Sequence, residues 1–193
     1  KSNIEMKNGI RKREENRGFE IEGKTIGLIG YGKTGKSFAK KLSGFNCNII
    51  FCDIKTNLGD NYAREVKINE LKETSDIISL HTNLNQSSRH IIDKQFIDDC
   101  KKSFCLINTA RGECISNHDL IYGLESDKII GAALDVLENE NKDFEGIEVD
   151  QNLDKLKKFE NVILTPHIAG WSKESKVKLA QITVNKIKEF LDL

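Results

Sequence analysis

Three glycines stand at a spacing suited to holding a phosphate chain against the protein backbone. Gly30, Gly32 and Gly35 form G-x-G-x-x-G directly after the apolar run 25–29. In this motif the first glycine permits a sharp turn, the second lets a pyrophosphate approach the backbone, and the third lets a helix pack closely on a strand. The N-terminus of that helix adds unpaired N–H groups and a partial positive charge. A glycine-rich turn alone is common and can be purely structural, so the interpretation depends on what surrounds it.

Asp53 supports a binding role for the glycine turn. It closes the next apolar run, 47–52, and lies 18 residues beyond Gly35. A carboxylate at the tip of this second strand accepts hydrogen bonds from ribose hydroxyls and repels a 2′-phosphate. Strand, helix, second strand and acid occur in the order of a dinucleotide site, and the acid favours NAD over NADP.

Two further residues have side chains suited to handling an organic acid. Arg111 lies in the phrase INTARG, and its planar guanidinium matches a carboxylate, although many arginines serve on the surface or at helix ends. His167 lies in TPHIAG, and an imidazole exchanges protons near neutral pH, although a single histidine after a strand is more often structural. A nearby carboxylate would favour the charged imidazole. Glu140 and Glu138 both compete for that place, and the sequence leaves the choice open.

These residues need a scaffold, and the apolar pattern predicts one. We expect strands at 25–29, 47–52, 66–68, 76–81, 104–108, 129–134 and 162–164, and helices at 37–42, 68–74, 88–101, 116–126, 153–159 and 171–193. Strands alternating with helices predict an α/β fold built on a doubly wound parallel sheet. Ligands on such sheets bind at the carboxyl ends of the strands. The residues that directly follow the expected strand ends are Gly30–Gly35, Asp53, His81, Thr82, Thr109–Arg111, Asp135 and His167.

The amino-acid composition argues against several classes of function. The 193 residues carry 30 basic and 30 acidic side chains, and no basic patch or polybasic stretch favours nucleic acid or a membrane as partner. No apolar run approaches the length of a membrane span. The five cysteines, at 47, 52, 100, 105 and 114, lack metal-ligand spacing, so we expect reduced thiols, a cytoplasmic location and no metal site.

Four phrases together resemble a known family. They are GKTIGLIGYGKTGKSFAKKL, SLHTNLNQSSRHII, INTARGECISNHDLIYGLESDKIIGAALDVLENE and NVILTPHIAGWSKES, and the likeness extends over most of residues 18–190. The chain resembles the NAD-binding portion of the D-isomer-specific 2-hydroxyacid dehydrogenases, the family of D-3-phosphoglycerate dehydrogenase, D-lactate dehydrogenase and glyoxylate/hydroxypyruvate reductase. Two departures are Asn83, where a proline is usual, and Lys33-Thr34, in place of Arg-Ile.

The resemblance implies roles for single residues. The substrate-binding arginine falls on Arg111, the acid/base histidine on His167 and its acid partner on Glu140. The nicotinamide-side aspartate falls on Asp135. Cofactor contacts fall on Gly30, Gly32, Lys33, Thr34, Gly35, Asp53, His81, Thr82, Thr109, Ala110, Ala169 and Gly170. The implied reaction passes hydride from NADH to the C2 carbonyl of a small 2-oxo acid, or oxidises a D-2-hydroxy acid in reverse.

The resemblance also implies a domain layout. Residues 1–170 would form the NAD-binding Rossmann domain, with 1–20 as an arriving helix or arm, and 171–193 would be a helix returning to a substrate domain largely missing from this segment. A homodimer is typical of the family. Two alternatives stay open: an NAD(H)-sensing scaffold like the related corepressors, and a formate dehydrogenase, whose branch pairs its histidine with glutamine rather than an acid.

Overall fold

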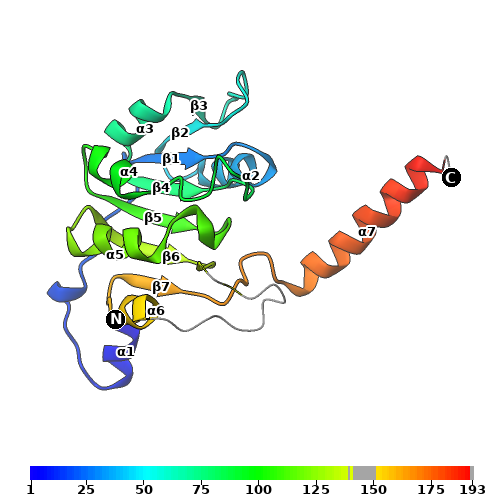
Figure 1. Ribbon diagram of the computed structural model, residues 1–193. Helices are drawn as coiled ribbons and strands as arrows, with labels where there is room; N and C mark the ends of the chain where they lie inside the picture. The colour runs from blue at the N-terminus through cyan, green and yellow to red at the C-terminus, as the bar shows by residue number, and fades with distance from the viewer. Residues whose placement is uncertain (139, 141–150, 192–193) are drawn as a thin grey trace.

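Seven parallel strands form a single sheet in the order β3-β2-β1-β4-β5-β6-β7 (Figure 1). The computed structural model describes residues 1–138, 140 and 151–191. The strands are β1 (Thr25–Ile29), β2 (Asn48–Cys52), β3 (Arg64–Glu65), β4 (Ile77–Leu80), β5 (Phe104–Asn108), β6 (Ile129–Leu134) and β7 (Val162–Leu164). The order runs outward in both directions from β1 and β4, which confirms the doubly wound sheet predicted from the sequence.

Helices cover both faces of this sheet. The α-helices are α1 (Ser2–Lys7), α2 (Lys33–Leu42), α3 (Ile68–Thr74), α4 (Lys94–Asp99), α5 (Asn117–Glu125), α6 (Gln151–Leu156) and α7 (Lys173–Phe190), and short 3-10 turns occur at Glu14–Asn16 and Gly112–Cys114. Successive strand side chains point to opposite faces. Ile49 and Phe51 of β2 therefore pack on the side of α2, whereas Ile50 between them joins the core under α3, α4 and α5.

The expected helix over 88–101 is wrong in its first half. Only α4 is helical there, because His90 takes a left-handed conformation with φ +50° and an α-helix cannot continue through it. Asp93 then starts α4, since its side chain accepts a hydrogen bond from Phe96 N at 2.7 Å. The expected third strand also shifts, from 66–68 to β3, and α2 begins at Lys33 rather than at residue 37.

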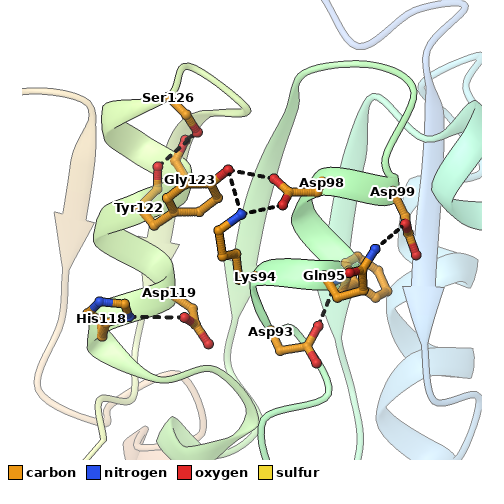
Figure 2. A network of polar contacts seen from close by, with 11 residues as sticks. Asp93, Lys94, Gln95, Asp98, Asp99, His118, Asp119, Tyr122, Gly123 and Ser126 are labelled. Atoms are coloured by element: carbon orange, nitrogen blue, oxygen red, sulfur yellow. Dashed lines mark hydrogen bonds and ion pairs between the residues drawn. The ribbon is translucent and has the colours of Figure 1, made fainter.

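A polar network joins α4 to α5 on one face of the sheet (Figure 2). The Tyr122 hydroxyl donates to Asp98 Oδ1 at 2.6 Å, and Lys94 Nζ donates to the other oxygen of the same carboxylate. The Lys94 ammonium also lies 4.2 Å from the centre of the Tyr122 ring, within the range of a cation–π contact. Ser116 begins α5 as predicted, because its Oγ accepts a hydrogen bond from Asp119 N.

The two ends of the described chain are more exposed than its centre. Helix α1 has no buried residue, and α7 extends away from the sheet (Figure 1). The predicted apolar stripe of α7 is exposed, including Val177, Val184 and Ile187. Residues 192 and 193 of the expected helix lie outside the described residues. No helix in the described part of the chain has both the length and the apolar content needed to cross a membrane.

Gly27 offers a test of how closely β1 and α3 pack. A Cβ atom at this position would lie 2.3 Å from Ser75 Oγ and 2.8 Å from Leu71 Cγ, both in buried residues. We expect Gly27→Ala to lower the free energy of unfolding by about 1–3 kcal/mol, because overpacking forces side chains from their rotamers. The measurement is urea unfolding followed by circular dichroism. Gly44→Ala is the control, since its Cβ meets nothing within 4 Å; equal stability of Gly27→Ala and wild type would contradict the prediction.

Candidate active site

The glycine turn between β1 and α2 has the geometry that its sequence predicts. Gly30 has φ +95°, and a Cβ there would lie 2.7 Å from the carbonyl oxygen of His81. A Cβ on Gly35 would lie 2.4 Å from the carbonyl oxygen of Gly30, so the start of α2 packs directly on the turn. A Cβ on Gly32 would meet nothing within 4 Å. The backbone at Gly32 is therefore open to a ligand, beside the unpaired N–H groups of the first turn of α2.

A cleft of about 1120 Å³ lies along this turn at the carboxyl edge of the sheet. Of the residues predicted to contact a cofactor, it is lined by Gly30, Gly32, Lys33, Thr34, Asp53, His81 and Thr82. It is also lined by residues that the sequence reasoning missed, among them Tyr31, Lys36, Ile54, Leu58, Val66 and Ile91. Ile54, Leu58 and Val66 are single apolar residues between polar ones or glycine and belong to no motif, so nothing in the sequence marks them as part of a cleft.

Asp53 is held rigidly at the side of the cleft. Its Oδ2 accepts a hydrogen bond from Tyr31 N at 2.6 Å, and its Oδ1 accepts one from Lys55 N at 2.9 Å. Each carboxylate oxygen has a second lone-pair direction. The carboxylate therefore can accept ribose hydroxyls while its orientation is fixed by the turn beside it. The open backbone at Gly32 and this fixed acid together fit a dinucleotide.

His81 forms part of the cleft wall as a neutral imidazole. Burial lowers the pKa of His81 to about 4, because a charged ring would lose its water. Its Nε2 lies 3.1 Å from Ser79 Oγ, and its ring centre lies 5.0 Å from that of Phe38 on α2. These contacts indicate that His81 shapes the cleft rather than exchanging protons.

The structure places Glu140 beside His167. Glu140 Oε2 lies 2.8 Å from His167 Nδ1, and Glu140 Oε1 accepts a hydrogen bond from Leu137 N at 2.7 Å. Glu138 turns elsewhere: its Oε1 lies 3.0 Å from His90 Nε2, and its Oε2 accepts from Asn117 N at 2.9 Å. The geometry resolves the choice that the sequence left open, in favour of Glu140.

Asp135 anchors the loop that carries His167. Its Oδ1 accepts hydrogen bonds from Thr165 Oγ1 at 2.6 Å and Ile168 N at 2.9 Å, and its Oδ2 accepts one from Ala169 N at 2.8 Å. The backbone carbonyl of Asp135 also accepts His167 N at 2.8 Å. This loop holds His167 at φ +53°, a left-handed conformation that these bonds stabilise. The sequence predicted a contact with a cofactor at Asp135 and missed this role in placing the histidine.

Arg111 lies beside the turn that leads to Glu140. A Cβ on the next residue, Gly112, would lie 1.9 Å from the carbonyl oxygen of Leu137, so the two segments touch there. The Arg111 side chain is exposed, and its Nη1 donates to Ala110 O. Buried Asn108 braces this turn, since its amide donates to Arg111 O and its carbonyl oxygen accepts Ala110 N. Like Asp135, Asn108 positions a loop of the site, and its sequence position did not predict this role.

The histidine cluster and the cleft are two parts of the same sheet edge. Within the described residues, the lining of the cleft ends at Ile91 and includes neither the cluster Arg111, Glu140 and His167 nor the predicted contacts Thr109, Ala110, Asp135, Ala169 and Gly170. Both parts follow carboxyl ends of parallel strands, with β4 and β5 between the glycine turn and β6. In the described part of the chain, no group of three or more His, Cys, Asp or Glu residues is placed to hold a metal ion.

The low pKa of His81 predicts how stability depends on pH. Between its ordinary value of 6.5 and about 4, the unfolded chain binds a proton that the folded chain excludes, so stability falls as the pH is lowered. We expect the free energy of unfolding to drop from pH 7 to pH 5 by about 2 kcal/mol more in wild type than in His81→Asn. Urea unfolding at the two pH values measures this difference.

His118→Asn is the matched control for that prediction, because the His118 side chain is 81% exposed. It should show the same dependence on pH as wild type. An identical loss of stability in wild type and His81→Asn would contradict the neutral state of the half-buried His81.

Comparison with known proteins shows which family the chain is similar to. Among curated proteins, the chain is 36% identical over 180 residues to an aromatic 2-oxoacid reductase of Clostridium sporogenes, covering 90% of this chain and 54% of that protein. It is 36% identical over 174 residues to a glyoxylate reductase of Thermofilum pendens, covering 88% of this chain and 49% of that protein. The chain spans about half the length of the curated relatives it matches.

A solved structure gives the same result for the fold. The NAD-complexed form of a D-isomer specific 2-hydroxyacid dehydrogenase from Lactobacillus delbrueckii ssp. bulgaricus superposes with a TM-score of 0.83 at 29% identity, covering 96% of this chain and 60% of that one. The family described as "D-isomer specific 2-hydroxyacid dehydrogenase, NAD binding domain" matches residues 1–169. The chain therefore belongs to the NAD-binding domain family of the D-isomer-specific 2-hydroxyacid dehydrogenases.

Proposed function

We propose that this chain binds NAD in the cleft beside the glycine turn, and that the protein containing it interconverts a D-2-hydroxy acid and a 2-oxo acid. One observation carries the proposal: the pairing of His167 with Glu140, at 2.8 Å, on the same sheet edge as the glycine turn. Such a pair supplies the acid/base group that reduction of a 2-oxo acid requires. When bound, NADH supplies the hydride that such a reduction requires.

The phosphate and ribose contacts follow from the shape of the cleft. The backbone at Gly32, with Lys33 and Thr34 at the start of α2, would hold the pyrophosphate. Asp53 would accept the ribose hydroxyls of the adenosine half, and its negative charge disfavours a 2′-phosphate. Gly35, His81 and Thr82 would shape the wall. Thr109, Ala110, Asp135, Ala169 and Gly170, on the other part of the edge, would line the nicotinamide end.

His167 is the proposed acid/base. Because His167 Nδ1 is bonded to Glu140, we assign proton exchange with the substrate oxygen to His167 Nε2. The carboxylate of Glu140 stabilises the imidazolium that donates a proton during reduction and re-forms during oxidation. Asp135 keeps the ring in place through the loop that it anchors.

Arg111 is the proposed substrate anchor. Its guanidinium offers two parallel N–H groups, which suit the carboxylate of a 2-oxo acid and polarise the neighbouring carbonyl. The names of the relatives span aromatic 2-oxo acids and glyoxylate, so the shared part of the substrate is the 2-oxo acid group rather than its side chain. Glyoxylate, hydroxypyruvate, pyruvate and phenylpyruvate represent that range.

The remaining proposals concern the whole protein. Residues 1–170 would be its cofactor domain, with 1–20 as an arriving arm and 171–193 as a helix that packs on a substrate domain. The exposed apolar side chains of α7 support that packing. The protein would be a cytoplasmic homodimer. The two curated relatives named above are reductases, which supports an enzyme over the scaffold alternative. The acid at Glu140 supports the dehydrogenases over the formate dehydrogenase branch, which by the resemblance pairs its histidine with glutamine.

Replacing Arg111 tests the proposed chemistry. The complete gene product should oxidise NADH with at least one of the four acids named above. Arg111→Ala should lower kcat/KM for that acid by about 10- to 100-fold, because a charge-assisted contact with the substrate carboxylate is lost. NADH binding, measured by fluorescence titration, should be unchanged.

Arg17→Ala is the control, since Arg17 is exposed and pairs with Glu14 outside the site. It should match wild type in every assay. Absence of NADH oxidation with all four acids would contradict the enzyme and favour the scaffold. Full activity of Arg111→Ala would contradict the role of Arg111 as the substrate anchor.

A further inference from the structure

The residue between the first two glycines, Tyr31, is hydrogen-bonded to two aspartates that lie seven positions apart, Asp53 and Asp60. Tyr31 is fully buried, and its ring stacks on Phe51 of β2 with ring centres 3.8 Å apart and planes inclined by 10°. Its backbone N–H donates to Asp53 at 2.6 Å, and its hydroxyl donates to Asp60 Oδ1 at 2.8 Å. One residue thus contacts both ends of the segment that runs from Asp53 to Asp60.

That segment forms one wall of the cleft. Ile54, Lys55, Thr56 and Leu58 all line it. Lys55 N donates to Asp53 at 2.9 Å, which fixes the near end of the segment. Leu58 N donates to Glu65 Oε2 at 2.9 Å, which ties the far end to β3. The wall follows the proposed ribose-binding acid, so it borders the adenosine half of a dinucleotide.

Asp60 connects the far end of the 53–60 segment to the glycine turn through its hydrogen bond with Tyr31. The Oδ1 atom that accepts the Tyr31 hydroxyl also accepts Tyr62 N at 2.9 Å and Ala63 N at 3.3 Å. Asp60 is an exposed residue, and the partial loss of water around its carboxylate opposes the charge. These hydrogen bonds outweigh that loss and hold the pKa of the carboxyl below its usual value. Burial, with the bond to Asp60, raises the pKa of Tyr31, so its phenol remains a donor. The Asp60 carboxylate therefore accepts hydrogen bonds both from its own turn, residues 60–63, and from Tyr31 in the glycine turn.

We propose that the Tyr31–Asp60 hydrogen bond positions the 54–58 wall and so sets the affinity of the cleft for the adenosine half of the dinucleotide. This inference rests on the proposed cofactor site. Without the bond, the wall has to be ordered when the ligand binds, and that ordering lowers affinity. The histidine cluster lies outside this part of the edge, so the chemical step is independent of the bond. Tyr31 and Asp60 are positioning residues that contact neither reacting atom.

Tyr31→Phe tests the inference, because it removes the hydroxyl and keeps the ring that stacks on Phe51. We expect the Kd for NADH and for ADP-ribose, measured on this chain by titration, to rise about five- to tenfold. In the complete gene product, the KM for NADH should rise to the same extent, while kcat and the KM for the 2-oxo acid stay as in wild type. A general structural defect would instead lower kcat and stability together.

Variants of Asp60 complete the experiment. Asp60→Asn keeps an oxygen acceptor for all three donors and should change the Kd for ADP-ribose less than twofold. Asp60→Ala also removes the acceptor of Tyr62 N and Ala63 N, so it should raise the Kd at least as much as Tyr31→Phe. Adding Tyr31→Phe to Asp60→Ala should weaken binding no further, because the Tyr31–Asp60 bond is already absent. Tyr62→Phe is the control for loss of a tyrosine hydroxyl in this region, since Tyr62 is exposed.

Two outcomes separate failure of this inference from failure of the proposed function. Wild-type affinity for NADH and ADP-ribose in Tyr31→Phe would overturn the role of the hydrogen bond and leave the cofactor site intact. Absence of binding of either ligand to the wild-type chain would overturn the cofactor site, and this inference with it.

Discussion

The parallel pairing of the seven strands determines where the residues of the proposed site meet. It places every carboxyl end on one edge of the sheet, so residues far apart in the chain meet there. The pairing β1–β4 sets Ile29 opposite Leu80, and the residues that follow these two come into contact: a Cβ on Gly30 would meet the carbonyl of His81. The glycines at 30 and 35 are needed because this edge is packed too tightly for side chains at those points.

Carboxylates and one amide hold the loops of this edge in place. Asp53 fixes the glycine turn, Asp135 fixes the histidine loop, and Asn108 fixes the turn before Gly112. Each accepts hydrogen bonds from backbone N–H groups that have no strand partner, which satisfies donors at the ends of the strands. The loops of the proposed site are therefore ordered by the protein itself before any ligand arrives, and this lowers the entropic cost of binding.

The sequence predicted the scaffold well because local patterns determine it. The bounds of β1, β5, β6, β7 and α3 agree with the expected ranges, since each is a short apolar run or a helical stretch ended by turn residues. The helix expected over 88–101 failed because the apolar pattern does not reveal the left-handed backbone of His90. The pattern also does not predict the contact of His90 with Glu138, because these two residues lie 48 positions apart in the chain.

The site was predictable in its residues and less so in its contacts. The glycine turn and Asp53 follow from spacing alone. Glu138 and Glu140 differ by two positions, so the sequence could not say which one faces His167. A local hydrogen bond from Leu137 N orients Glu140, and a tertiary one from Asn117 N holds Glu138 away from the histidine. The anchoring roles of Asp135, Asn108 and Tyr31 were missed because each depends on partners that only folding brings near.

The decisive measurement is a crystal structure of the complete gene product with NADH and a 2-oxo acid. We expect the pyrophosphate against residues 30–35, the adenosine ribose on Asp53, and both the His167 imidazole and the Arg111 guanidinium facing the substrate beside the nicotinamide. A pyrophosphate bound away from residues 30–35, or His167 and Arg111 on opposite sides of the sheet, would contradict it.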